Sequence, residues 1–125
     1  MTNKISRYRR KELYYYCLQY KEWEKLYLSR SLISTNYLTD IANPSISDKT
    51  SKIATEQAIL ANKMKQIKMI AKEADPELAF YIFKNVTDKN CSIVKLQVNY
   101  DMPCSEKTLR RRCDRFYEIL SKIRE

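Results

Sequence analysis

Residues 104–120 read CSEKTLRRRCDRFYEIL and hold four arginines, a lysine, two cysteines and two aromatic side chains. Apolar residues recur in and just after this stretch at alternating spacings of four and three, the period of one helix face: Leu109, Cys113, Phe116, Leu120 and Ile123. Ser105 is a suitable N-cap for such a helix, and Glu106 supplies first-turn negative charge. The stretch therefore predicts an amphipathic helix that begins at Ser105.

The side of this helix away from the apolar stripe is strongly basic in its first three turns. A solvated helix face normally mixes positive and negative charges, and cations near a helix N-terminus oppose the helix dipole. Helix stability alone therefore does not explain the charge, and an anionic partner explains it better. The residues expected to contact that partner are Ser105, Lys107, Thr108, Arg110, Arg111, Arg112 and Arg115.

A short helix is expected directly upstream, over residues 91–100, followed by a break. Pro103 cannot lie in a helix interior, and it pushes Met102 out of helical geometry. A short helix, a break and a longer helix with basic and hydroxyl residues in its first turns form the pattern of a helix-turn-helix, whose second helix enters the DNA major groove. Double-stranded DNA is therefore the expected partner.

Another helix start is expected at residues 75–77, which read DPE. The aspartate is a suitable N-cap, the proline suits the first helical position, and the glutamate adds negative charge to the first turn. The helix that follows directs Leu78, Ala79, Ile82, Phe83 and Val86 towards a core. It ends near residues 87–90, where Asp88 or Asn90 is expected to cap the next helix. Residues 75–125 are thus predicted to form the DNA-binding region.

In the N-terminal part, apolar periodicity predicts two long helices, over residues 6–30 and 51–74. All the predicted elements are thus helices, and the expected fold class is all-α. The apolar stripe of the first consists of Leu13, Tyr16, Tyr20, Trp23 and Tyr27. The stripe of the second consists of Ile53, Gln57, Leu60, Met64, Ile67, Ala71 and Ala74. Residues 31–50 are rich in Ser, Thr, Asn and Asp and are expected to be a connector. Residues 1–74 thus form either an antiparallel helical hairpin or a coiled coil with a second subunit.

A second basic cluster lies at the start of the first predicted helix. It consists of Arg7, Arg9, Arg10 and Lys11, and it is a candidate accessory contact for nucleic acid. The tyrosines that follow are of the kind that stack on bases of single strands. A Tyr/Trp stripe at heptad spacing is nevertheless more typical of a core or of a surface that packs on another helix.

Composition narrows the function classes further. The chain has a net charge of +9, which favours polyanionic partners. It contains no glycine, which excludes Walker and Rossmann nucleotide sites, and no histidine, which excludes Ser-His and Cys-His catalytic pairs and His-bearing zinc sites. The four cysteines show no C-x-x-C spacing, so neither a metal site nor a disulfide is expected. We expect no enzymatic activity and no cofactor.

No membrane segment is expected. The apolar runs are much shorter than the roughly 20 residues that a membrane-spanning helix needs, and the N-terminal MTNKISRYRRK is not followed by the apolar core of a signal peptide. A cytoplasmic protein is therefore expected.

Residues 71–125, AKEADPELAFYIFKNVTDKNCSIVKLQVNYDMPCSEKTLRRRCDRFYEILSKIRE, with YYYCLQYKEWEKL upstream, resemble small proteins encoded by bacteriophages and prophages of low-GC Gram-positive bacteria. That family consists of transcription regulators with a helix-turn-helix like region 4 of sigma-70 factors, related to phage late-gene activators. The resemblance implies a recognition helix from Ser105 and action at a promoter or operator. Many helix-turn-helix turns carry glycine, whereas this one reads Asp101-Met102-Pro103-Cys104.

Three functions remain open from the sequence. The first is a DNA-binding transcription regulator whose long helices form a dimer or a platform for RNA polymerase. The second is the small terminase subunit of a phage packaging machine, which also joins a helix-turn-helix to long helices. The third is an adaptor that binds a host protein through the N-terminal aromatic stripe.

Overall fold

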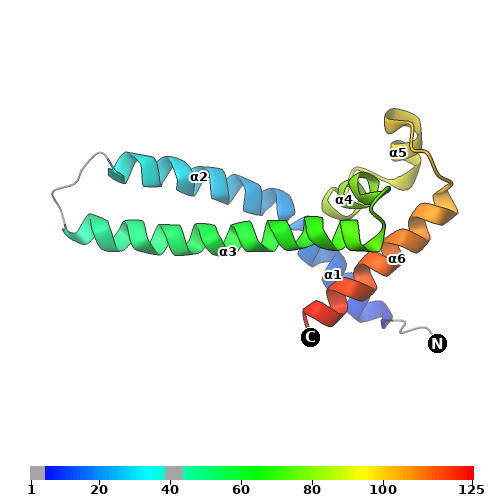
Figure 1. Ribbon diagram of the computed structural model, residues 1–125, viewed down its shortest axis with the longest axis horizontal. Helices are drawn as coiled ribbons and strands as arrows, with labels where there is room; N and C mark the ends of the chain where they lie inside the picture. Colours follow the sequence, from blue (N-terminus) through cyan, green and yellow to red (C-terminus); the bar gives the residue numbers. More distant parts are fainter. Residues whose placement is uncertain (1–4, 39–43) are drawn as a thin grey trace. The chain divides into compact units, whose positions relative to one another are not determined.

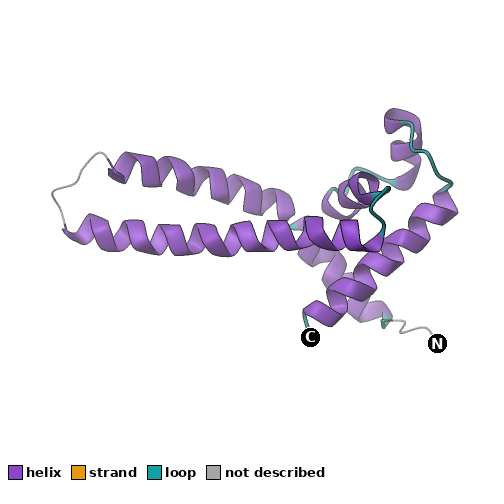
Figure 2. Cartoon of the chain, viewed as in Figure 1, coloured by secondary structure: helices purple, strands orange, loops and turns teal. Residues whose placement is uncertain are grey.

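The fold is all-α, as predicted. The computed structural model describes the backbone of residues 5–38 and 44–125, and the side chains of residues 5–30, 52 and 54–125. Six helices and no strand lie in these described residues (Figure 1, Figure 2). The helices are α1 (Arg7–Leu18), α2 (Tyr20–Leu38), α3 (Pro44–Ala74), α4 (Ala79–Thr87), α5 (Ile93–Tyr100) and α6 (Glu106–Ile123).

The chain divides into two compact units. One consists of residues 1–20 and 66–125, and the other of residues 21–65. The boundary predicted at residues 74 and 75 does not coincide with this division. The reason is that α1 packs against α4 and α6, so the start of the chain belongs with its C-terminal half.

The unit of residues 21–65 is a hairpin of two helices that run antiparallel. The side-chain amide of Gln57 donates to the backbone oxygen of Tyr27 at 3.3 Å, and Arg30 pairs with Glu56 at 3.0 Å. These contacts join α2 to α3 within one chain, as one of the two predicted alternatives requires. Gln57, the polar residue of the predicted stripe, thus contributes a hydrogen bond to the hairpin.

The predicted connector over residues 31–50 is wrong for most of its length. α2 continues to residue 38 and α3 begins at Pro44, while residues 39–43 lie outside the described residues. Pro44 occupies the first helical position, where its fixed φ suits the helix and its missing N–H is not needed. Ser, Thr and Asn are less favourable than Ala in a helix by only about 0.5 kcal/mol per residue. That penalty did not prevent the two helices from extending.

The predicted helix over residues 6–30 is interrupted at Gln19. The N–H of Gln19 donates to the carbonyl of Tyr16 at 3.2 Å, a bond to the third preceding residue that tightens the end of α1. α2 then starts at Tyr20. Of the predicted stripe, Leu13, Tyr20 and Trp23 are buried and the remaining two tyrosines are half-buried.

α4 begins later than predicted, and its N-cap is Leu78, without a side-chain bond, rather than the predicted Asp75, which instead holds the turn before the helix. The side-chain oxygen Oδ1 of Asp75 accepts from the N–H groups of Glu77 and Leu78 at 3.0 and 3.3 Å. Residues 76–78 form a turn, and regular helix starts only at Ala79. Leu78, Ile82 and Val86 are buried as expected, which fixes the inward face of α4.

The predicted cap of the next helix is wrong. Ser92 caps α5, because its Oγ accepts from the N–H of Lys95 at 3.2 Å. Asp88 instead accepts from the N–H of Asn90 at 2.9 Å and holds the preceding turn. α5 therefore starts at Ile93 rather than at Cys91.

α6 is the element against which α1, α4 and α5 all pack (Figure 1). The predicted stripe is buried from Leu109 to Leu120, but Ile123, at the last position of the helix, is 48% exposed and does not belong to it. The buried face is wider than predicted and also includes Tyr117, Ile119 and Ser121. α1 covers part of this width, since Arg9 donates to both the hydroxyl and the carbonyl of Ser121 at 3.3 Å.

Replacement of Phe116 tests this core. Phe116 is fully buried, so Phe116→Ala is expected to lower the free energy of unfolding by about 3 to 5 kcal/mol, through lost burial and a residual cavity. Ile123→Ala, at a half-exposed position of the same helix, is the control and is expected to cost less than about 1 kcal/mol. Urea denaturation followed by circular dichroism measures both. Equal effects of the two substitutions would contradict the packing described for α6.

Candidate nucleic-acid interface

A turn without glycine precedes α6. α5 ends at Tyr100, and Asp101 adopts the left-handed conformation with φ 51° and ψ 49°, the only positive φ in the part of the chain that the structure describes. Asp is one of the few residues other than glycine that visit this conformation, because its short polar side chain bonds locally. Asp101 thus occupies a backbone conformation that glycine usually adopts. The next residue, Met102, is buried.

The two hydroxyl residues of the predicted site stabilise the start of α6. The Oγ of Ser105 accepts from the N–H of Thr108 at 3.2 Å, as predicted for an N-cap. The same Oγ lies 2.9 Å from the hydroxyl of Thr108, so the two hydroxyl groups also hydrogen-bond to each other. Ser105 and Thr108 therefore fix the first turn from which the basic side chains project.

Two of the predicted arginines are paired with carboxylates of the same chain. Arg110 contacts Glu106 at 2.6 Å, one helical turn away, and Arg112 contacts Asp75 at 3.0 Å. Both arginine side chains remain about half exposed or more, and pairs in such positions contribute about 0 to 1 kcal/mol. The carboxylates therefore orient these arginines but hold them only weakly.

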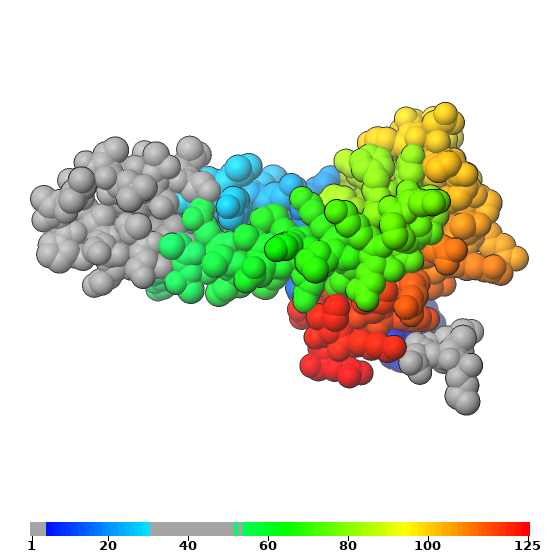
Figure 3. Space-filling model, viewed as in Figure 1, coloured from blue at the N-terminus to red at the C-terminus, as the bar shows by residue number. Residues whose placement is uncertain are grey.

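The other three predicted cations form a ridge without such partners. Lys107, Arg111 and Arg115 are exposed, and none of them makes a hydrogen bond or ion pair with another residue that the structure describes. Their spacing of four residues places successive side chains about 6 Å apart along the helix and on neighbouring positions around it. We call these three residues the α6 ridge. In Figure 3 the first turns of α6, in orange, lie at the surface of the molecule.

The N-terminal basic cluster separates into two pairs. Arg9 donates to the carbonyl of Arg124 at 3.2 Å in addition to its bonds with Ser121, and Arg10 pairs with Asp114 and lies over the ring of Tyr117 at 4.8 Å. These two arginines attach α1 to α6. Arg7 and Lys11 are exposed and make no ion pair with any described residue. Only this second pair offers free charge.

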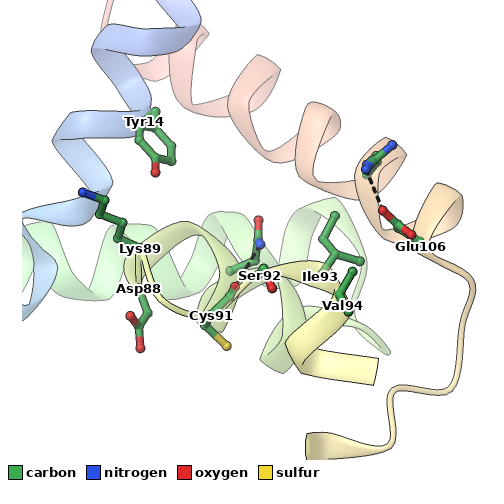
Figure 4. Close-up of a pocket in the computed structure, with 10 residues that line it drawn as sticks. Tyr14, Asp88, Lys89, Cys91, Ser92, Ile93, Val94 and Glu106 are labelled. Atoms are coloured by element: carbon green, nitrogen blue, oxygen red, sulfur yellow. Dashed lines mark hydrogen bonds and ion pairs between the residues drawn. The ribbon is translucent and has the colours of Figure 1, made fainter. Parts of the chain in front are cut away.

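A pocket of about 310 Å³ opens beside the start of α6 (Figure 4). Tyr14 of α1, Asp88 and Lys89 of the loop before α5, and the pair Glu106 and Arg110 of α6 all line it. The lining contains two acids and two cations, so its charge is balanced. The pocket therefore offers a less favourable environment for a phosphate than the α6 ridge does.

The cysteines support the core. All four are free thiols, and the described residues contain no group of three or more potential metal ligands of the types His, Cys, Asp and Glu. Burial raises the pKa of Cys17 and of Cys113 to about 12, so both thiols stay protonated. The Sγ of Cys113 donates to Asn85 at 3.5 Å, while the amide of Asn85 donates to the carbonyl of Cys91 at 3.1 Å. Asn85 thus joins α4 to the α5 loop and to α6, a role that no sequence pattern had indicated.

Comparisons with known proteins do not identify a relative. No protein-family model, no curated protein and no solved structure matches this chain. No helix among the described residues is long and apolar enough to cross a membrane.

Thiol reactivity tests the burial of the cysteines. Cys104 is half-exposed, whereas Cys17, Cys91 and Cys113 are buried. Burial raises the pKa of Cys104 and raises that of Cys17 and Cys113 to about 12, and only the thiolate attacks a disulfide reagent, so solvent access is what favours Cys104. At pH 8 an aromatic disulfide reagent is expected to modify Cys104 in the folded protein, and Cys17 and Cys113 only after unfolding. Cys104→Ser is the control and should abolish the native-state reaction, as measured by mass spectrometry of peptides. Modification of Cys113 as fast as Cys104 would contradict the burial described here.

Proposed function

We propose that this protein binds duplex DNA through α6 and regulates transcription, as a regulator of the kind that bacteriophages and prophages encode. The observation that carries the proposal is the α6 ridge, whose three cations face solvent while the opposite face of the same helix is buried. Cations without partners on one face of a firmly packed helix complement the phosphates and guanine edges of DNA. The phage or prophage origin rests on the sequence resemblance alone.

In this proposal α5, residues 101–105 and α6 act as a helix-turn-helix. Two features support it, the short helix that ends at Tyr100 and the left-handed Asp101 in the turn. The first turns of the second helix enter the major groove in that arrangement, and here those turns carry the α6 ridge. Ser105 and Thr108 hold the start of the helix.

The contacts of the basic residues suggest different roles for them. Arg111, in the second turn and without a carboxylate partner, is the best candidate for a bidentate contact with guanine. Lys107 lies close enough to the helix start to contact a base or a phosphate, and Arg115, one turn further along, is placed for phosphate. To reach DNA, Arg110 would have to leave Glu106, which costs little for an exposed pair, and Arg112 would have to leave Asp75, whose side chain is only 18% exposed.

The adaptor alternative has no comparable support. It needs the N-terminal aromatic stripe as an open surface, but Leu13, Tyr20 and Trp23 of that stripe are buried. RNA polymerase and a second copy of the chain remain proposed partners of the regulator.

Single substitutions separate base reading from charge. The target is first selected from a random pool of duplexes. Arg111→Ala is expected to weaken binding to that site by about 1 to 3 kcal/mol and to relax the preference at one base pair, because a guanine contact is lost. Arg115→Ala is expected to weaken binding to all sequences alike. Lys122→Ala removes an exposed cation in the last turn of α6 and is the matched control, with no change expected. Uniform losses for both arginines, measured on single-base variants of the site, would contradict sequence reading.

The salt dependence of binding tests the electrostatic part. If about 4 to 6 phosphates are neutralised, the plot of log affinity against log salt concentration is expected to have a slope of about −4 to −5, because bound cations release condensed counterions. Arg115→Ala should make the slope shallower by about 1. Fluorescence anisotropy at several salt concentrations provides the measurement. A slope near zero for the unmodified protein would refute the proposed function.

A further inference from the structure

α1 has a second face that points away from the core. Leu13 and Cys17 on the inward side are fully buried, whereas Tyr8 and Tyr15 are 81% and 62% exposed. The two tyrosines are seven positions apart, which is close to two helical turns, so they lie on the same side of α1 with their backbone positions about 10 Å apart along the helix. Tyrosines that serve the core are found elsewhere on the helices, as in the case of the buried Tyr20. Tyr15 contacts the neighbouring ring of Tyr14 edge-on, with ring centroids 5.2 Å apart, but packing against the core does not account for the two exposed rings.

Free cations lie beside the exposed tyrosines. Arg7 precedes Tyr8, and Lys11 lies one helical turn from both Arg7 and Tyr15, so the four residues share one helix face. Neither cation has an ion-pair partner among the described residues, whereas Glu12 on the same helix is paired with Arg9. The face thus combines positive charge with flat aromatic surface.

This combination fits a strand of unpaired nucleic acid. Such strands are held by cations that follow the phosphates and by aromatic rings on which the bases stack. The bases of a duplex are stacked on each other and closed to a tyrosine ring, so the rings favour an unpaired strand over the duplex proposed for α6. An acidic protein would satisfy the two cations but would make no specific use of both exposed rings.

The helix that carries this face, α1, is also firmly attached to α6. Arg9 and Arg10 attach α1 to α6 through Ser121, Arg124, Asp114 and Tyr117. A helix held in this way loses little conformational freedom on binding. The exposed face of α1 and the α6 ridge share no residue, so substitutions can test the two surfaces separately.

We propose that Arg7, Tyr8, Lys11 and Tyr15 form a binding site for single-stranded nucleic acid, with the tyrosines stacked on bases and the cations on phosphates. The site goes beyond the proposed duplex recognition and does not depend on it. Its contacts are insensitive to sequence, because every base presents a face for stacking.

The experiment measures binding of the full chain to a fluorescent oligothymidylate of about 16 nucleotides and, in parallel, to the selected duplex. Tyr8→Ala and Tyr15→Ala are each expected to weaken oligothymidylate binding by about 5- to 150-fold and to leave duplex binding unchanged. Tyr8→Phe and Tyr15→Phe keep the aromatic ring and are the matched controls, expected to bind within about 2-fold of the unmodified protein. Because both tyrosines are exposed, all four variants should keep the melting temperature of the unmodified protein.

Several results would overturn the inference. They are absence of oligothymidylate binding, equal losses for the alanine and phenylalanine variants, or displacement by polyglutamate as effective as by unlabelled oligothymidylate. The last result would indicate a surface for acidic proteins or for anions in general. Arg111→Ala keeps the two proposals apart, because it should weaken duplex binding and spare oligothymidylate. Tyrosine-dependent binding of oligothymidylate without any duplex binding would refute the proposed function and support this inference.

Discussion

The burial of one face of α6 is the constraint on which the unit of residues 1–20 and 66–125 depends. α1, α4 and α5 contain 12, 9 and 8 residues, and helices of about 12 to 15 residues or fewer are marginal by themselves in water. Each of them packs against α6, where Leu109, Phe116 and Leu120 are inaccessible to solvent. Because residues are spaced 100° apart around a helix, burial of this face also determines which side chains point outward. The solvent exposure of the α6 ridge is thus a consequence of the packing of the core.

Because the chain contains no glycine, polar side chains cap the helices and hold the turns between them. Ser6, Ser92 and Ser105 cap α1, α5 and α6, and Asp75 holds the turn before α4. Asp101 takes the left-handed conformation that costs most residues about 1 to 2 kcal/mol. A glycine at that position would lower this cost but would leave the unfolded chain freer and the turn less constrained. Asp101 therefore leaves the turn before α6 with less conformational freedom than a glycine would.

The sequence predicted α6 best, because several independent signals agree there. The break at Pro103, the cap at Ser105 and the apolar stripe all point to the same helix, and only the last stripe position, Ile123, is exposed. The interruption at Gln19 was not predictable, since neither glycine nor proline marks it. The connector was misjudged because composition is a weak guide to helix length.

The partners of the basic residues were also beyond the reach of sequence patterns. The pairing of Arg10 with Asp114 joins residues 104 positions apart, and that of Arg112 with Asp75 joins α6 to the turn before α4. Only the pairing of Arg110 with Glu106 lies at the local spacing of four residues. Periodicity therefore predicted which residues are exposed but not which of the exposed arginines already have a carboxylate.

The cations of α6 thus differ in whether a carboxylate compensates their charge. A cation in the first turn of a helix is unfavourable by about 0.3 to 1 kcal/mol when nothing compensates it, and the effect falls off beyond that turn. Carboxylates compensate Arg110 and Arg112, and Glu106 also interacts favourably with the N-terminal end of the dipole. Lys107, Arg111 and Arg115 have no such compensation within the described chain. Of these three only Lys107 lies in the first turn of α6, so the unfavourable interaction with the helix dipole is confined to that residue. In the proposed complex, the phosphates of DNA would supply the negative charge that the α6 ridge lacks in the free protein.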